Sequence, residues 1–341
     1  MKMLNKYNTY ICYSEFHLFI ALVNVLFDKT KSSYILCPSE IKGLVYSIDI
    51  ENCVFLFYEK QKIEEAWDEF KKKNKYSFFK YKAGLKSIVT SLFPIAKYDV
   101  IFSRSFFFVF NDGTPFVLYL LIYYASSYFT LFEEGELIYS TRRLVRNDII
   151  KRVMGFPLPF GRSAQIKNVQ VRFPERLPRY LKKKSSFFDI NMMVNHISKE
   201  EQKSLLSAFG VPVDSVITDD RKNVLLITQP LSEDTIISED EKIKLYKSVI
   251  APYMNGYNIY IKPHPRETTD YSLLIDKRYI LPSHFPVELF VFLSFNFDVA
   301  ITLFSTAIHL IPAKTTIILG LDHDSAVEKG WKRICGVKNK L

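Results

Sequence analysis

The sequence predicts an α/β protein with two domains, each built on a mostly parallel, doubly wound sheet. Three observations lead to this prediction. The chain has 341 residues, which is more than one ordinary hydrophobic core accommodates. Its residues are 48% hydrophobic and 15% aromatic, which is enough to bury sizeable cores. Short apolar runs alternate with helical patterns in two separate regions, as is typical of parallel strands covered by helices on both faces.

The first alternating region is assigned to a domain at residues 1–155. Its patterns predict strands at 8–14, 32–38, 52–59, 98–103 and 128–134, and helices at 17–27, 63–73 and 115–125. The apolar run from Phe116 to Phe132 opens after a Thr-Pro pair and is interrupted by two serines. We therefore expect a buried helix and a buried strand there, not a membrane span. Glu15 and His17 interrupt the first apolar run, so a signal peptide or anchor is not expected either.

Residues 156–220 are assigned to a basic connecting region. The change of character begins at Arg142, because residues 142–184 contain thirteen Lys/Arg and four prolines but only Asp148 and Glu175 as acids. We expect little regular structure and a basic face in this segment. A solvated basic loop explains the same composition.

The second alternating region is assigned to a domain at residues 221–341. It predicts strands at 222–231, 255–265, 297–304 and 315–321, and helices at 239–254, 286–296, 305–312 and 327–337. In parallel sheets of this kind, ligands bind at the carboxyl ends of the strands. The strand ends of both regions are therefore the places where functional residues are expected.

Charge and cysteine content limit the partners and the compartment. There are 46 Lys and Arg against 36 Asp and Glu, a net charge of +10. That balance suits an anionic partner such as a nucleic acid, a membrane surface or a phosphorylated substrate. The four cysteines show no paired spacing, so buried thiols in a reducing, cytoplasmic compartment are expected, not disulfides or a zinc site.

Three acids, Glu133, Glu134 and Glu136, lie at the end of the strand predicted at residues 128–134. Because adjacent strand residues point to opposite faces, only one of Glu133 and Glu134 can face a given cleft. Crowded carboxylates raise one another's pKa, which brings one of them closer to use as a general base. Gly135 permits a tight turn and the close approach of a ligand. The alternative is a turn that merely carries acids.

A histidine between two prolines lies at the end of the strand predicted at residues 255–265. The prolines restrict the backbone and hold His264 at the strand end. An imidazole there can donate to a phosphate or protonate a leaving group. Lys262 and Arg266 add positive charge, and Pro265 follows the histidine directly. An ordinary turn histidine is the alternative.

Further candidates lie at helix starts and at one late turn. Ser305 and Thr306 open a helix, where hydroxyl and backbone N–H groups either bind an anion or cap the helix. Glu288 can cap its helix or bind a ribose diol. His17 lies at the first strand–helix turn and can reach a cleft. The Asp322-His323-Asp324 sequence can hold Mn²⁺ or Mg²⁺, or it is an ordinary strand-exit turn.

The ordered set Glu-Glu-Gly, His-Pro, Pro-x-Glu and Ser-Thr resembles the bacterial sialyltransferases. The compact length and the initial strand–helix pattern are similar to glycosyltransferase family 52 in particular, which includes lipooligosaccharide and capsule sialyltransferases. The resemblance implies a GT-B type fold, with two Rossmann-like domains facing a central cleft. It also implies an inverting, metal-independent transfer of sialic acid from CMP-sialic acid to a glycan hydroxyl.

The resemblance also assigns roles to residues. Glu133 is the expected general base, supported by Glu134 and Gly135. His264 faces the donor phosphate as general acid or electrostatic stabiliser. Ser305 and Thr306 hold that phosphate, and Glu288 binds the ribose. Lys262 and Pro265 complete the expected nucleotide site, and His17 is a further candidate.

Two alternatives remain open at this point. One is a related GT-B glycosyltransferase that uses another nucleotide sugar. The other is a non-catalytic protein that binds nucleic acid or membrane through the basic segment, although no nucleic-acid motif accompanies it. The partners expected are the donor and a glycan acceptor, with no cofactor or metal and no nucleic acid. A homodimer and peripheral contact with the inner face of a bacterial cell membrane are left open.

Overall fold

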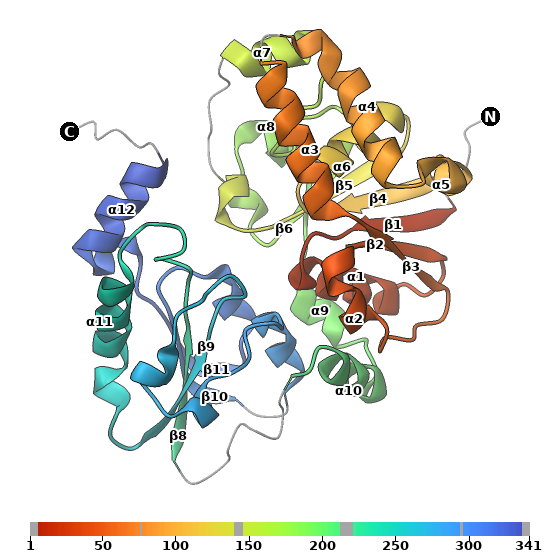
Figure 1. Cartoon of the computed structure of the whole chain (residues 1–341). Coiled ribbons are helices and arrows are strands. Elements are labelled where there is room, and N and C mark those ends of the chain that lie inside the picture. The colour runs from red at the N-terminus through yellow and green to blue at the C-terminus, as the bar shows by residue number, and fades with distance from the viewer. Residues whose placement is uncertain (1–5, 76, 140–145, 212–220, 294–295, 336–341) are drawn as a thin grey trace. The chain divides into compact units, whose positions relative to one another are not determined.

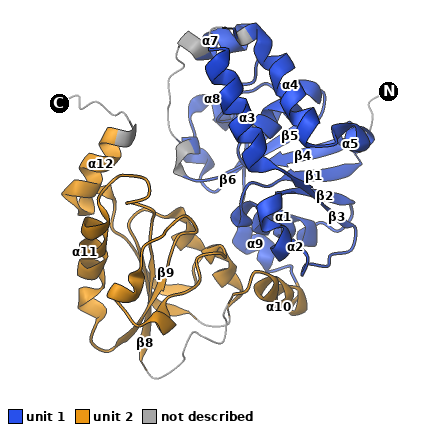
Figure 2. Ribbon diagram, viewed as in Figure 1, with its two compact units in different colours: residues 1–197 blue, residues 198–341 orange. Residues whose placement is uncertain are grey.

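The computed structural model describes residues 6–75, 77–139, 146–211, 221–293 and 296–335. The chain divides into two compact units, residues 1–197 and 198–341 (Figures 1 and 2). Each unit is built on a parallel sheet whose strands alternate with helices. The two-domain α/β organisation expected from the sequence is therefore present.

The first unit contains a seven-stranded sheet with the order β3-β2-β1-β4-β5-β6-β7. The strands are β1 (Tyr7–Ile11), β2 (Ser33–Pro38), β3 (Cys53–Tyr58), β4 (Ser105–Val109), β5 (Tyr128–Phe132), β6 (Ile166–Val171) and β7 (Ser185–Phe187). All neighbouring strands in this sheet pair in parallel. Their carboxyl ends therefore share one edge, where ligands bind in sheets of this type.

Helices connect these strands. They are α1 (Glu15–Phe27), α2 (Lys42–Val45), α3 (Lys60–Lys73), α4 (Tyr81–Leu92), α5 (Ile95–Phe102), α6 (Pro115–Tyr123), α7 (Arg146–Val153), α8 (Arg179–Lys182) and α9 (Ile190–Val194). Short 3₁₀ segments are η1 (Ser39–Ile41), η2 (Phe78–Lys80), η3 (Glu136–Tyr139) and η4 (Pro174–Arg176). Helix α3 shows why such segments form: Ile63 and Trp67 are buried at helical spacing while Lys62, Lys72 and Lys73 are exposed.

The two faces of the first sheet carry different side chains, since successive residues of a strand alternate between faces. Phe107 and Phe129 stack on one face and share a core with Trp67 of α3 and Phe116 of α6. The other face includes Tyr10, next to the segments α1 and α9, which contact each other (Figure 1). The apolar run from Phe116 to Phe132 is thus divided between a buried helix and a buried strand, as predicted. No helix among the described residues is long and apolar enough to cross a bilayer.

One predicted strand is wrong. Residues 98–102 of the strand predicted at 98–103 belong to α5, and β4 follows at Ser105. The apolar residues Ile95, Tyr98 and Phe102 recur at helical spacing, and Phe102 is completely buried. A short apolar run does not by itself distinguish a strand from a buried helix segment.

The basic region is more regular than expected from the sequence. Residues 156–197 belong to the first unit and supply β6, β7, α8 and α9, whereas residues 212–220 lie outside the described residues. Val169 and Val171 alternate with polar residues in β6 and enter the core, and Leu181 of α8 joins them. The high Lys/Arg content of the surrounding segment hid this alternation, in which the outer positions of β6 are Lys167, Asn168 and Gln170.

The second unit contains a four-stranded parallel sheet with the order β11-β10-β8-β9. The strands are β8 (Lys222–Ile227), β9 (Tyr257–Lys262), β10 (Phe297–Thr302) and β11 (Ala313–Ile318), and the α-helices are α10 (Lys199–Ala208), α11 (Glu239–Ile250) and α12 (Ser325–Cys335). A capping box between Ser238 and Glu241 begins α11. The 3₁₀ segments are η6 (Ala251–Tyr253), η7 (Tyr271–Leu273), η8 (Lys277–Tyr279), η9 (Val287–Phe292), η10 (Thr306–Leu310) and η11 (Leu321–His323). The helices predicted at 286–296 and 305–312 are thus short 3₁₀ segments.

Candidate active site

Glu133 lies directly after β5 and is held by its neighbours. Its Oε1 accepts hydrogen bonds from the Arg172 guanidinium at 3.0 and 3.3 Å, and its Oε2 accepts from the Arg172 backbone N–H at 2.8 Å. The Tyr139 hydroxyl also donates to Oε2. The Glu133 side chain is only 6% exposed. Each oxygen therefore receives two donors, which fills the lone-pair sites of a carboxylate.

Glu134 has a different environment. Its side chain is 43% exposed, and its Oε1 lies 3.3 Å from Nε2 of the buried His17. The His17 Nδ1 accepts a hydrogen bond from the Tyr13 backbone N–H at 3.1 Å, and its ring stacks on Phe110 at 4.3 Å. Because Nδ1 accepts, the proton of a neutral imidazole is on Nε2 and points to Glu134. His17 thus orients an accessible carboxylate at the carboxyl edge of the first sheet.

Gly135 gives this turn its shape. Its φ is +143°, a backbone conformation that favours glycine, and a Cβ atom built there would contact nothing within 4 Å. The glycine is therefore required by the backbone, and the space beside it stays open. The sequence-predicted residues His17, Glu133, Glu134 and Gly135 all lie together at this edge.

His264 lies in the turn after β9, at the carboxyl edge of the second sheet. Its Nδ1 accepts from the Arg266 backbone N–H at 3.1 Å, and its own backbone N–H donates to Glu267 at 2.8 Å. Burial, with Arg266 and Lys262 nearby, lowers the pKa of His264 to about 4. The imidazole is therefore neutral near pH 7, with its proton on Nε2 and directed away from the turn.

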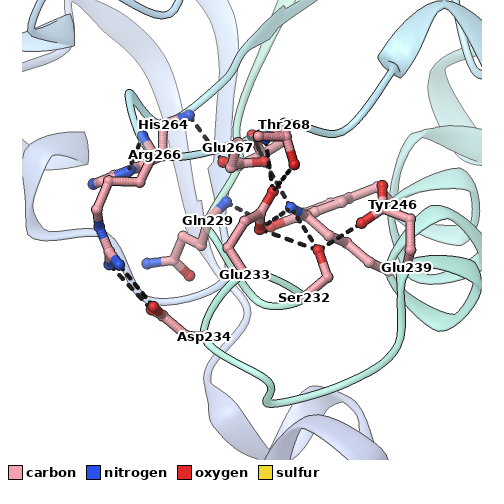
Figure 3. A network of polar contacts seen from close by, with 12 residues as sticks. Gln229, Ser232, Glu233, Asp234, Glu239, Tyr246, His264, Arg266, Glu267 and Thr268 are labelled. Carbon is pink, nitrogen blue, oxygen red and sulfur yellow. Dashed lines mark hydrogen bonds and ion pairs between the residues drawn. The ribbon is translucent and has the colours of Figure 1, made fainter.

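A buried ionic network below His264 was not predicted. The Lys242 ammonium of α11 is fully buried and lies 2.9 Å from Glu233 and 3.0 Å from Glu267. Glu267 also accepts from the hydroxyls of Thr228, at 2.8 Å, and Tyr271. Although burial opposes ionisation, hydrogen bonds from Thr268 and Lys242 lower the pKa of Glu233 to about 2. The network ties α11 to the ends of β8 and β9 and fixes the His264 turn (Figure 3).

The remaining residues of the His264 turn differ in direction. Lys262 is buried, and its ammonium donates to the carbonyls of Pro263, at 3.0 Å, and Ser283, at 3.2 Å. It therefore stabilises the turn from inside. Arg266 reaches outward and forms a bidentate pair with Asp234 at 2.7 and 3.1 Å (Figure 3). Pro265 is exposed.

The hydroxyl pair after β10 caps a short segment. The Ser305 Oγ accepts from the Ala307 N–H at 3.3 Å, and the Ser305 N–H donates to Thr302 at 3.2 Å. Thr306 and Glu288 are both half-buried. Ser305 and Thr306 lie at the same sheet edge as His264, because β8, β9 and β10 run in parallel.

The Asp-His-Asp turn after β11 has a structural use. Asp324 Oδ1 accepts from the N–H groups of Ala326, at 2.8 Å, and Val327, at 3.1 Å, where α12 begins. Asp322 and His323 are exposed. Within the described ranges, no group of three or more His, Cys, Asp or Glu side chains is arranged to hold a metal ion. This geometry supports a role for Asp324 in capping the start of α12.

Sequence reasoning missed the partners of the site residues. Arg172 is 39 residues from Glu133, so its ion pair leaves no local pattern. Lys242 likewise reads as a surface lysine of a charged helix start. Glu267 could have been predicted from the sequence. It follows the His-Pro pair by two residues and is the acid nearest to that pair.

Comparison with known proteins gives a family match and a relative. A family model with the description Glycosyltransferase family 52 matches residues 52–319. An uncharacterized protein of Haemophilus influenzae is 29% identical over 279 residues, covering 80% of this chain and 87% of that protein.

Solved structures with a similar fold include a UDP-GlcNAc 2-epimerase from Neisseria meningitidis bound to UDP-GlcNAc. It has a TM-score of 0.50 at 11% identity and covers 96% of this chain and 91% of its own. The spinosyn rhamnosyltransferase SpnG has a TM-score of 0.43 at 12% identity, with coverages of 90% and 79%. At such identities the likeness concerns the fold alone. Together with the two parallel sheets, the likeness to the epimerase confirms the predicted GT-B type with two Rossmann-like domains.

Proposed function

Because the chain belongs to glycosyltransferase family 52, we propose that it transfers sialic acid from CMP-sialic acid to a hydroxyl group of a glycan acceptor. The observation that carries this proposal is the pair formed by His17 and the accessible Glu134 at the carboxyl edge of the first sheet. A glycosyl transfer needs a base for the acceptor hydroxyl. His17 orients the Glu134 carboxylate by contacting one of its oxygens and leaves the group able to accept a proton.

Glu134 is the general base in this proposal, in place of Glu133. One Glu134 oxygen lies near His17 Nε2, and the other has no hydrogen-bond partner within the described part of the chain, so it can accept the proton of the acceptor hydroxyl. Glu133 is already bonded twice at each oxygen by Arg172 and Tyr139. It fixes the turn after β5 and thereby the direction of Glu134. The resemblance alone favoured Glu133, and the geometry supports its neighbour.

His264 stabilises the leaving group. Its neutral ring presents Nε2–H, which can donate to a phosphate oxygen of CMP, while Ser305 and Thr306 supply hydroxyl groups at the same sheet edge. Glu288 is proposed to bind the ribose. Lys262 supports the turn from its buried position, so its contribution to the nucleotide is indirect.

The proposed transfer forms one bond and breaks one bond, and it needs no cofactor. The acceptor oxygen forms a bond to the anomeric carbon and gives its proton to Glu134. The bond from that carbon to the phosphate oxygen breaks, and CMP leaves with the electron pair, facing His264. Inversion follows because attack and departure occur on opposite sides of the carbon.

A donor screen tests this function. Purified protein is incubated with CMP-sialic acid and, separately, with UDP-, GDP- and ADP-sugars, and nucleotide release is measured with and without glycan acceptors. CMP release that increases with acceptor is expected. Release of another nucleotide in place of CMP would support a related glycosyltransferase with a different donor.

A further inference from the structure

A cavity of about 350 Å³ lies in the first unit at the carboxyl ends of β1 to β3. Its volume falls in the lower range of small-molecule sites. Its wall includes Tyr13 and Ser14, which both form hydrogen bonds with His17, the partner of the proposed base Glu134. The residues lining it are Tyr13, Ser14, Glu15, Pro38, Glu40, Ile41, Lys60, Gln61 and Glu64.

Carboxylates dominate the charge of this cavity. Glu15, Glu40 and Glu64 face one ammonium group, that of Lys60. Lys60 is engaged elsewhere, since its Nζ donates to the Tyr13 carbonyl at 3.2 Å and lies 5.2 Å from the Tyr13 ring centre. Among the described residues, none forms a hydrogen bond or ion pair with the side chains of these three glutamates.

The environment of Glu64 is consistent with uncompensated negative charge. Burial raises the pKa of Glu64; Lys60 opposes this shift, and Asp68 and Glu40 add to it. The cavity is therefore locally acidic in a chain whose net charge is +10. A ligand in this cavity is therefore surrounded mainly by negative charge, although the protein as a whole is positively charged.

We propose that this cavity binds the acceptor sugar and selects an uncharged, hydroxyl-bearing sugar against one that carries a carboxylate. The inference rests on the proposed function, in which Glu134 receives the acceptor proton. Carboxylate oxygens accept hydrogen bonds from sugar hydroxyls without needing a counter-ion. A second carboxylate brought among Glu15, Glu40 and Glu64 is repelled, so the same wall discriminates against acids.

One consequence concerns the number of sugars added. Sialic acid carries a carboxylate, so the product of a first transfer is an anionic acceptor. The cavity disfavours this product by charge. The enzyme is therefore expected to add mainly a single sialic acid.

Matched acceptors test this selection. The best neutral acceptor is found among p-nitrophenyl glycosides, and kcat/KM is then measured for its uronamide and its uronate, which differ in charge but hardly in size. We expect the uronamide to be preferred by about tenfold or more at low salt. Glu40→Gln and Glu64→Gln each reduce this preference several-fold. Glu69→Gln, an exposed change on α3 outside the cavity, leaves it unchanged.

Two outcomes overturn the proposal. One is equal use of uronate and uronamide by the unmodified enzyme. The other is an unchanged preference in both Glu40→Gln and Glu64→Gln. Absence of CMP release from CMP-sialic acid counts instead against the proposed function. The acceptor pair is then measured with whichever nucleotide sugar is turned over, so that charge selection is decided independently of the donor.

Discussion

The neighbouring residues Glu133 and Glu134 have different roles: the first stabilises the turn after β5, and the second is the proposed general base. Glu133 is buried against Arg172 and Tyr139, whereas Glu134 is accessible and lies next to His17. Their opposite directions follow from the extended backbone at the end of β5. The sequence predicts that the two side chains point to opposite sides. It does not predict their partners, because each partner comes from a distant part of the chain.

The first prediction compares the amides of these two acids. Glu134→Gln should fold normally and lower kcat about 10²–10⁴-fold, because an amide cannot accept the acceptor proton. Glu133→Gln should instead lower the thermal stability, since it leaves the Arg172 guanidinium without its carboxylate and such losses cost about 3–5 kcal/mol when buried. Turnover and thermal unfolding are measured for both. A stable but inactive Glu133→Gln beside an active Glu134→Gln would return the base to Glu133.

The second prediction concerns the titration of His264. Its pKa of about 4 lies below the usual value of about 6.5. This depressed pKa means that the folded protein loses stability as pH falls from about 6.5 toward 4, because the unfolded chain takes up the proton first. A phosphate at Nε2 favours the charged ring, so saturating CMP should raise the pKa of His264. NMR titration with and without CMP measures this, with His264→Gln to assign the signal. An unchanged pKa would remove His264 from the phosphate site.

At the scale of elements, α11 determines the position of the His264 turn through one buried lysine. Lys242 bridges Glu233 and Glu267, and Glu267 accepts from the His264 backbone N–H. The bonds of Glu267 also reach Thr228 at the end of β8. A helix and two strand ends are thereby joined at one ionic centre.

The third prediction is that Lys242→Met weakens both folding and CMP binding. The substitution leaves two buried carboxylates without a cation, which costs about 3–5 kcal/mol. The His264 turn loses its support, so CMP affinity falls as well. Urea unfolding and calorimetric titration with CMP are the measurements. Lys247→Met, an exposed change on the same helix, should alter neither; equal behaviour of the two variants would show that the network is not needed.

The fourth prediction is that chelation leaves transfer intact. The Asp324 carboxylate caps α12, and the phosphate charge can be met by His264, Ser305 and Thr306. Activity in EDTA should therefore equal activity in buffer. Loss of activity that Mn²⁺ restores would contradict this and would direct attention to Asp322 and Asp324.

The sequence was informative where a local pattern determines an element. The apolar runs that became β1, β2, β3 and β5 are bounded by turn residues, so their ends and the motifs placed there were predicted. The helix α5 was mistaken for a strand because six residues are too few to show a period. The long-range partners Arg172 and Lys242 were not predictable, because no local pattern links them to Glu133 or Glu267.

At the scale of the whole molecule, two parallel sheets place their strand ends at separate edges, one in each unit. The base and its histidine belong to the first unit, and the proposed phosphate site belongs to the second. Three of their acids, Glu133, Glu233 and Glu267, are paired with Arg172 or Lys242. Many other Lys and Arg side chains are exposed and contribute to the net charge of +10.

That surface charge leads to the last prediction. We expect the protein to cosediment at low salt with vesicles that contain anionic lipid, and not with neutral vesicles. Each Lys or Arg near such a surface contributes about 1 kcal/mol, and salt near 0.5 M should release the protein because the Debye length shortens to about 4–5 Å.

Charge reversal locates the contact. Arg179, Lys182 and Lys183 are exposed in the basic segment, and their joint replacement by Glu should weaken vesicle binding on the order of 100-fold. The matched control reverses three exposed lysines elsewhere, Lys72, Lys247 and Lys277. A smaller effect of the control places the basic segment against the lipid. Equal effects would mean that only the total charge matters, and binding that survives 0.5 M salt would show that charge is not the cause.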